Sequence, residues 1–150
     1  MTDIWAPHLT VAAVIERDNR FLLVEENSDG QIVLNQPAGH VEENESIIEA
    51  VIRETLEESG RHFVPEAIVG IYRWRSPLNH VTYLRVAYTG QCSPRDRDIS
   101  LDTDIITTHW LSYTEVTQNI SIHRSPLLMR CINDYLAGQR LPLNLINELT

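Results

Sequence analysis

The order of hydrophobic and polar positions along the chain predicts several strands and a smaller number of helices. Short stretches rich in Val, Ile and aromatic residues are bounded by turn residues, which is typical of strands. These stretches are residues 9–16, 21–25, 32–35, 67–74, 81–88 and 105–111. Helical spacing predicts a central helix over 47–59, a short helix over 114–118 and a longer one over 125–137. This order of elements predicts an α/β fold, an α/β/α sandwich in which helices flank a mixed sheet.

Turn residues mark the boundaries between these elements. Residues 17–20, Arg-Asp-Asn-Arg, separate the first two strands and predict a hairpin. Pro37 disfavours a helical conformation at Gln36, so the third strand is expected to end there. Residues 93–104 form an acidic stretch of loop composition before the last strand.

The central helix carries signals at both of its ends. Ser46 and Glu49 have the spacing of a capping box, and Gly60 stands where a left-handed C-terminal cap is favoured. One half of the helical wheel is expected to pack on the sheet. That half consists of Ile47, Ile48, Val51, Ile52, Thr55 and Leu56. The polar half consists of Glu49, Ala50, Arg53, Glu54, Glu57 and Glu58.

Composition narrows the classes of function. A chain of 150 residues suits one domain, which is expected to span residues 1–150. The net charge of -9 speaks against sequence-independent binding of nucleic acid, because such binding needs a basic surface. The acidic balance fits an enzyme for a small ligand, whose acidic groups are neutralised locally by divalent cations.

The cysteines and the apolar stretches indicate the cellular compartment in which the protein is expected. Cys92 and Cys131 lack a Cys-x-x-Cys spacing, so a reducing compartment is the simpler interpretation. The N-terminus shows no basic region followed by an apolar run, and no apolar stretch approaches the ~20 residues that span a bilayer. We expect a cytoplasmic monomer or small homo-oligomer that binds neither nucleic acid nor a membrane.

Three glutamates are expected to lie together on the central helix. Glu54 and Glu57 are three residues apart and Glu54 and Glu58 four apart, so they occupy neighbouring surface positions. Like charges at this spacing destabilise a helix by a few tenths of a kcal/mol per pair, unless a cation lies between them. Clustered carboxylates are the ligands that Mg²⁺ prefers. On the helix alone, a solvated acidic face with a Glu49–Arg53 surface pair is the favoured interpretation, because acidic helical faces are common.

The spacing of fixed residues around this helix decides between these interpretations. The chain resembles the Nudix box, Gly-x5-Glu-x7-Arg-Glu-U-x-Glu-Glu-x-Gly-U, where U is a bulky aliphatic residue. The fixed positions are matched by Gly39, Glu45, Arg53, Glu54, Glu57, Glu58 and Gly60. Thr55 and Arg61 occupy the two U positions, and Ala38 replaces the first glycine of the usual Pro-Gly-Gly entry. Residues 39–61 therefore resemble the catalytic motif of the Nudix hydrolases.

The resemblance implies roles for these residues. Glu54, Glu57 and Glu58 are expected to bind Mg²⁺, with Mn²⁺ as an acceptable substitute. Glu57 is the favoured residue for preparing the attacking water. Arg53 is expected to orient the glutamates through charge-assisted hydrogen bonds, and Glu45 to pair with Arg53.

Two further metal ligands follow from the resemblance. The family uses a backbone carbonyl at the position of Ala38, and alanine keeps that carbonyl. Some members add an acidic ligand about six residues before a late-strand tryptophan, and that offset from Trp110 selects Asp104. The same loop offers alternatives in Asp102, Asp98 and Asp96. A solvated loop without a metal role is also compatible with these residues.

Blocks outside the box resemble the NudJ group of phosphatases within the family. They are residues 7–12, 23–26, 35–40, 124–127 and 138–143. The resemblance implies hydrolysis of hydroxymethylpyrimidine pyrophosphate, thiamine pyrophosphate and nucleoside di- and triphosphates to monophosphates. The alternatives are a Nudix hydrolase for damaged nucleotides, dinucleoside polyphosphates or ADP-ribose, and a non-catalytic Nudix-like ligand sensor.

Substrate contacts are expected from one strand and one turn. Arg73, Trp74 and Arg75 alternate along a strand, so Trp74 faces away from the two arginines. Trp74 would stack on the substrate ring and the arginines would bind phosphate. The competing interpretation is a core tryptophan with surface arginines. His40 follows Gly39 directly and is expected to contact a phosphate oxygen, unless it serves only the turn.

Overall fold

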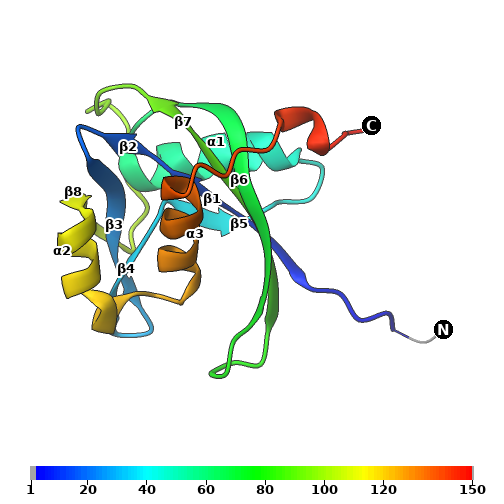
Figure 1. Cartoon of the computed structure of the whole chain (residues 1–150). Coiled ribbons are helices and arrows are strands. Elements are labelled where there is room, and N and C mark those ends of the chain that lie inside the picture. The colour runs from blue at the N-terminus through cyan, green and yellow to red at the C-terminus, as the bar shows by residue number, and fades with distance from the viewer. Residues whose placement is uncertain (1–2, 150) are drawn as a thin grey trace.

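The strands of residues 3–149, which the computed structural model describes, form two sheets of four strands each. The first sheet has the order β5 (Ala38–His40), β1 (His8–Val14), β7 (Thr82–Cys92) and β6 (Phe63–Arg75). β1 and β7 are parallel, whereas β5 pairs with β1 and β6 pairs with β7 in antiparallel orientation. The predicted mixed sheet is confirmed, and β5 is one of its edge strands (Figure 1).

The second sheet is antiparallel. It consists of β2 (Glu16–Arg17), β3 (Arg20–Ser28), β4 (Gln31–Asn35) and β8 (Ile105–Ser112). The predicted hairpin turn is confirmed, because Asp18 and Asn19 join β2 to β3 with φ of 52° and 62°. Positive φ at both central residues is the requirement of a type I′ turn, which follows the twist of the paired strands.

Helices cover both faces of the first sheet. α1 (Ile47–Ser59) contacts β1, β5 and β6, whereas α3 (Leu127–Leu136) contacts β1 and β6. Val11 of β1 belongs to the core cluster of α1, and Val14 to the core cluster of α3. Odd and even positions of a strand face opposite sides of a sheet, so the two helices lie on opposite faces. This arrangement is the expected α/β/α sandwich (Figure 1).

Short helices complete the described chain. α2 (Tyr113–Gln118) follows β8 directly, and the 3-10 helices η1 (Ile120–Ile122) and η2 (Leu143–Leu145) flank α3 in the sequence. The predicted short helix 114–118 is thus confirmed as α2. β5 was not expected, because the pattern around Pro37 indicated only the end of a strand. Its three residues pair with β1 although they carry no hydrophobic alternation.

The caps of α1 are as the sequence predicts, but its faces are not. The Ser46 hydroxyl accepts the Glu49 N–H, and Gly60 closes the helix with a φ of 70°. The buried positions are Ala50, Val51, Thr55, Glu58 and Ser59. The expectation that Ala50 and Glu58 lie on the polar half was therefore wrong. The sheet lies closer to those positions than the hydrophobic pattern suggests, and Ile52 is instead 36% exposed.

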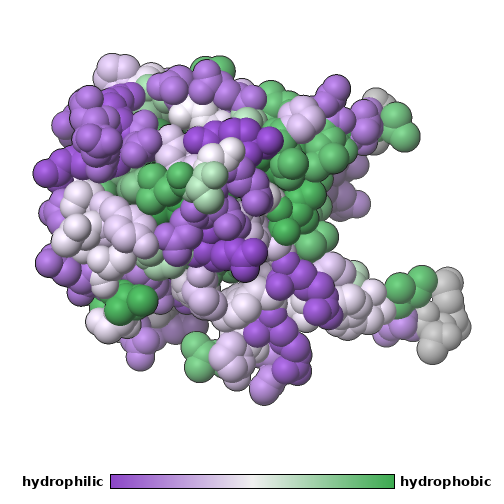
Figure 2. Space-filling view, viewed as in Figure 1, coloured by the Kyte–Doolittle hydropathy of each residue, from purple (hydrophilic) through white to green (hydrophobic). Residues whose placement is uncertain are grey.

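The face of the molecule in Figure 2 is mostly polar, and hydrophobic residues gather on parts of it. Figure 2 shows hydrophobic surface beside β6 and the C-terminal segment, amid hydrophilic neighbours. Exposed hydrophobic residues on these elements include Val64, Ile71 and Leu145. Among the described residues, none of the helices has the length and apolar composition needed to cross a membrane.

Candidate active site

The carboxylates of α1 lie against the backbone of the edge strand β5. A methyl group added to Gly39 would stand only 2.2 Å from the carboxyl carbon of Glu54. The glycine is therefore required by the close approach of that side chain, because its backbone φ is not in the left-handed region. On the same strand, the Ala38 N–H donates to Oε1 of Glu58 at 2.8 Å. Both entry residues of the box thus position glutamates.

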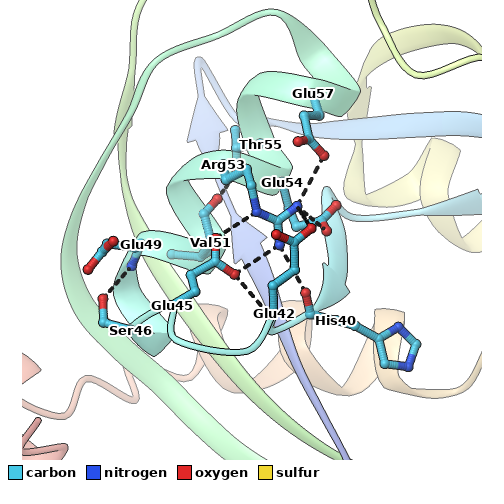
Figure 3. A network of polar contacts seen from close by, with 10 residues as sticks. All are labelled: His40, Glu42, Glu45, Ser46, Glu49, Val51, Arg53, Glu54, Thr55 and Glu57. Atoms are coloured by element: carbon cyan, nitrogen blue, oxygen red, sulfur yellow. Dashed lines mark hydrogen bonds and ion pairs between the residues drawn. The ribbon is translucent and has the colours of Figure 1, made fainter. Parts of the chain in front are cut away.

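Arg53 holds the acidic side chains together. Its Nε donates to Glu45 Oε2 at 2.6 Å, and its Nη1 donates to Glu54 Oε1 at 2.8 Å and Glu57 Oε2 at 3.1 Å. Its Nη2 reaches the carbonyl of His40 at 3.0 Å, which ties β5 to the helix (Figure 3). The hydrogen bond from Arg53 lowers the pKa of Glu45. The expected Arg53–Glu45 pair is present, and both groups remain charged.

Burial disfavours the charge of two glutamates. The Glu54 side chain is 12% exposed, and burial raises its pKa to about 7, although Arg53 opposes this shift. Burial also raises the pKa of Glu58 well above its usual range, with Glu26 and Glu54 adding repulsion and the Ala38 N–H opposing it. A divalent cation beside these groups would remove this penalty, because it favours their charged form.

The structure brings Asp102 to the glutamates. Carboxylate oxygens of Glu54, Glu57 and Asp102 lie within 4.8 Å of one another. The loop is anchored at this residue, because the Asp102 N–H donates to the carbonyl of Glu57 at 2.9 Å. Asp104 does not join this group; its backbone carbonyl accepts the Asn27 N–H, beside the turn between β3 and β4. The group therefore contains Asp102, one of the alternatives from the sequence, and not Asp104, which the offset from Trp110 selects.

The donor set suits a hard divalent cation. Clustered carboxylates with neighbouring backbone oxygens are the ligands of Mg²⁺ and Mn²⁺, and nothing in the cluster is a soft ligand. Glu58 lies next to the group of Glu54, Glu57 and Asp102, since it experiences the charges of Glu54 and Asp102. The residues present thus fit the ion that the motif implies.

The expected substrate contacts lie away from these carboxylates. The ring of His40 points away from the glutamates, and its Nε2 lies 3.0 Å from Nδ1 of His8 (Figure 3). Burial and the neighbouring His8 lower the pKa of His40. Trp74 packs against the core of α3 and stacks on Tyr83. Arg73 and Arg75 lie on β6, at the opposite edge of the sheet from β5.

One charged pair near the cluster was not assigned from the sequence. Glu26 on β3 is 6% exposed and forms an ion pair with Nη1 of Arg124, which precedes α3. Glu26 also contributes to the raised pKa of Glu58, so the pair lies beside the carboxylates. Arg124 is 98 residues away from Glu26 in the chain, and no local pattern predicts such a contact.

Comparisons with known proteins agree with the geometry. The sequence model of the NUDIX domain matches residues 6–131. Phosphatase NudJ of Escherichia coli (strain K12) is 35% identical over 145 residues, which are 97% of this chain and 94% of that protein. Phosphatase NudJ of Shigella flexneri matches equally well.

Solved structures extend this similarity to the fold. A NUDIX hydrolase from Nitrosomonas europaea is 50% identical with a TM-score of 0.94, covering 96% of this chain and 98% of that one. The NUDIX domain of Shewanella oneidensis NrtR, complexed with ADP ribose, has a TM-score of 0.71 at 19% identity and 90% coverage of both chains. That second likeness concerns the fold alone. Motif, fold and relatives therefore agree that the chain belongs to the Nudix hydrolases, enzymes that act on pyrophosphate bonds.

Proposed function

We propose that this enzyme hydrolyses hydroxymethylpyrimidine pyrophosphate, thiamine pyrophosphate and nucleoside di- and triphosphates to monophosphates, with Mg²⁺ as its cofactor. The observation that carries the proposal is the group of Glu54, Glu57 and Asp102 oxygens, which lie within 4.8 Å of one another. A diphosphate is protected from attack by its own negative charge, and a metal-loaded carboxylate cluster removes that protection. The similarity to phosphatase NudJ over 97% of the chain supports the choice of substrates.

Five positions would hold the ion. Glu54, Glu57 and Asp102, whose oxygens cluster, would supply carboxylate ligands together with Glu58, and Ala38 would supply its backbone carbonyl. Bound Mg²⁺ would neutralise phosphate charge and lower the pKa of a coordinated water. Mn²⁺ prefers the same oxygen ligands and would substitute for it.

The side chains around the ion have different roles in the reaction. Glu57 is 40% exposed, more than Glu54, and we assign it the role of general base, which accepts a proton from the attacking water. Arg53 keeps the carboxylates of Glu54 and Glu57 in fixed positions through its hydrogen bonds. Glu45 positions Arg53 in turn, from the loop before the helix. Phosphoryl transfer depends mainly on such positioning and on charge.

A substrate panel tests the proposal. Purified protein with Mg²⁺ is given each pyrophosphate and nucleotide, and orthophosphate and pyrophosphate are measured separately. Release of orthophosphate from thiamine pyrophosphate is the expected result. Release of pyrophosphate alone from nucleoside triphosphates, or activity confined to ADP-ribose, would point to another Nudix substrate. Ligand binding without any hydrolysis would identify a sensor.

Two aspartates of one loop provide a matched test of the metal site. Asp102→Asn removes a carboxylate that lies within reach of Glu54 and Glu57, so the Mg²⁺ concentration for half-maximal activity should rise by at least roughly tenfold. Asp104→Asn makes the same change two residues away and should leave the metal dependence unaltered. If Asp104→Asn has the larger effect, the assignment to Asp102 is refuted.

The proposal covers the whole chain as one domain. Leu141 bridges to Ile68 of β6, and Leu143 and Ile146 pack against the core of α1. These contacts support a single domain that includes residues beyond the matched 6–131. Free Cys92 and Cys131 support our placement of the enzyme in the cytoplasm.

A further inference from the structure

Aromatic side chains line up across the first sheet on its α3 side. In the strand register, His8 lies opposite Tyr83 and Tyr83 opposite Trp74, so the three side chains are neighbours on one face. Trp74 stacks on Tyr83 with centroids 6.0 Å apart, and His8 meets Tyr83 edge-on at 5.8 Å. His40 joins them at 5.1 Å from His8. We call His8, His40, Trp74 and Tyr83 the aromatic row.

The aromatic row is accessible to a ligand. His8 and His40 are exposed, and Trp74 and Tyr83 are only partly buried. Nearby core aromatics such as Tyr72 are covered by α3. A half-exposed stack of rings at the border of the core offers a flat apolar surface of the kind that planar heterocycles bind.

A buried cation lies next to the aromatic row. Arg85 is two residues from Tyr83 on β7 and so faces the same side, yet it is only 5% exposed. Its Nη1 donates to Oε1 of Gln36 at 3.0 Å and to Sγ of Cys131 at 3.9 Å, and its Nε has no hydrogen-bond partner. Within residues 3–149, the ion pairs do not include Arg85. A buried arginine without a carboxylate is costly, so this position places an uncompensated positive charge beside the aromatic row.

The aromatic row and the carboxylates lie around the same edge strand. On β5 the α-carbon of Gly39 faces Glu54, so the adjacent His40 faces the opposite side of the sheet. Arg124 links the two regions electrostatically, because it pairs with Glu26 and its charge helps to lower the pKa of His40. Tyr83 is two strands from β5, roughly 10 Å away. A substrate with its ring on the aromatic row and its diphosphate at the carboxylates would pass around β5.

We propose that the aromatic row binds the planar nitrogen heterocycle of the substrate and makes the enzyme prefer heteroaromatic diphosphates over alkyl diphosphates. The inference rests on the proposed function and adds the residues that select the substrate. Trp74 and Tyr83 supply the stacking surface.

Steady-state kinetics with a matched pair of substrates test this inference. Thiamine pyrophosphate carries heteroaromatic rings, whereas isopentenyl diphosphate carries the same diphosphate on an alkyl group. Trp74→Ala and Tyr83→Ala should each raise KM for thiamine pyrophosphate roughly tenfold, the usual loss of a stacking partner. KM for isopentenyl diphosphate should change less than about twofold. Tyr113→Ala, at a 41% exposed tyrosine of α2, is the control and should alter neither.

The outcomes separate the two proposals. If wild-type protein hydrolyses both diphosphates and each variant changes them equally or not at all, the aromatic row does not select substrates. If wild-type protein hydrolyses neither, the proposed function fails, and quenching of tryptophan fluorescence by thiamine tests the row directly. That quenching should be lost in Tyr83→Ala, and quenching that persists there overturns the inference. If Trp74→Ala does not fold, Trp74→Leu replaces it, and Trp74→Phe should keep the wild-type KM.

Discussion

Replacing Gly39 by alanine should lower the activity of this enzyme and leave its stability almost unchanged. The added methyl group would lie 2.2 Å from the carboxyl carbon of Glu54 and 2.3 Å from its Oε1. Ordinary contacts between carbon atoms need about 3.5 Å, so the carboxylate must move by at least ~1 Å. The side chain is the flexible partner, and its displacement would break the 2.8 Å bond from Arg53.

The expected loss of activity follows from this displacement. A misplacement of ~1 Å in a catalytic constellation costs about 100-fold in rate, equivalent to roughly 2.7 kcal/mol. Stability should change by less than about 1 kcal/mol, because the backbone at Gly39 accepts alanine and the released Glu54 gains hydration. Turnover of thiamine pyrophosphate and urea unfolding without metal measure the two effects.

Gly138 provides a control variant that should lose stability and keep its activity. Gly138, which follows α3, has a φ of 87° and no atoms within 4 Å of an added methyl group. Gly138→Ala should therefore cost roughly 1–2 kcal/mol of stability through backbone strain, while kcat stays at the wild-type value. Wild-type kcat in Gly39→Ala, or a loss of activity that merely follows unfolding, would refute the reasoning.

Further changes test the site and the fold. Glu57→Gln should lower kcat by at least roughly 100-fold without altering the melting temperature, whereas Glu49→Gln on the same helix should keep kcat. Ser112→Ala removes a capping box in which both hydrogen bonds form, and should cost about 1 kcal/mol in urea unfolding. In metal-free protein, burial raises the pKa of Glu54 to about 7, so the folded state binds its proton more tightly than the unfolded state. Melting temperature in EDTA should therefore rise as pH falls from 8 towards 5, and Glu54→Gln should reduce this rise; an unchanged slope would contradict the assignment.

The sequence predicts the elements that depend on local chemistry. The limits of α1 agree with the prediction because Ser46 and Gly60 satisfy backbone groups within one turn of their own positions. The turn at Asp18 and Asn19 is similarly local. Fixed spacing in the box places Arg53 beside Glu57, because residues four apart on a helix are neighbours whatever the rest of the chain does.

Contacts between distant segments could not be predicted in this way. Asp102 is held beside the glutamates by a backbone hydrogen bond from its N–H to the carbonyl of Glu57, which no count from Trp110 includes. His8 meets Tyr83 only because β1 and β7 pair in parallel, and one residue of register shift would place them on opposite faces. Such pairings depend on the packing of the whole sheet rather than on either segment.

The burial of Glu58 connects the fold to the chemistry. An apolar residue there would extend the core of α1, yet the position carries a carboxyl group that is 8% exposed and bound to the Ala38 N–H. In metal-free protein this burial disfavours the charged form of Glu58, and Glu54 suffers the same effect. Burial of these two carboxyl groups therefore destabilises the metal-free protein at the place where α1 meets the edge strand β5. A divalent cation that binds there favours the charged carboxylates and stabilises the folded protein. The burial that destabilises the metal-free fold therefore strengthens the affinity for the ion.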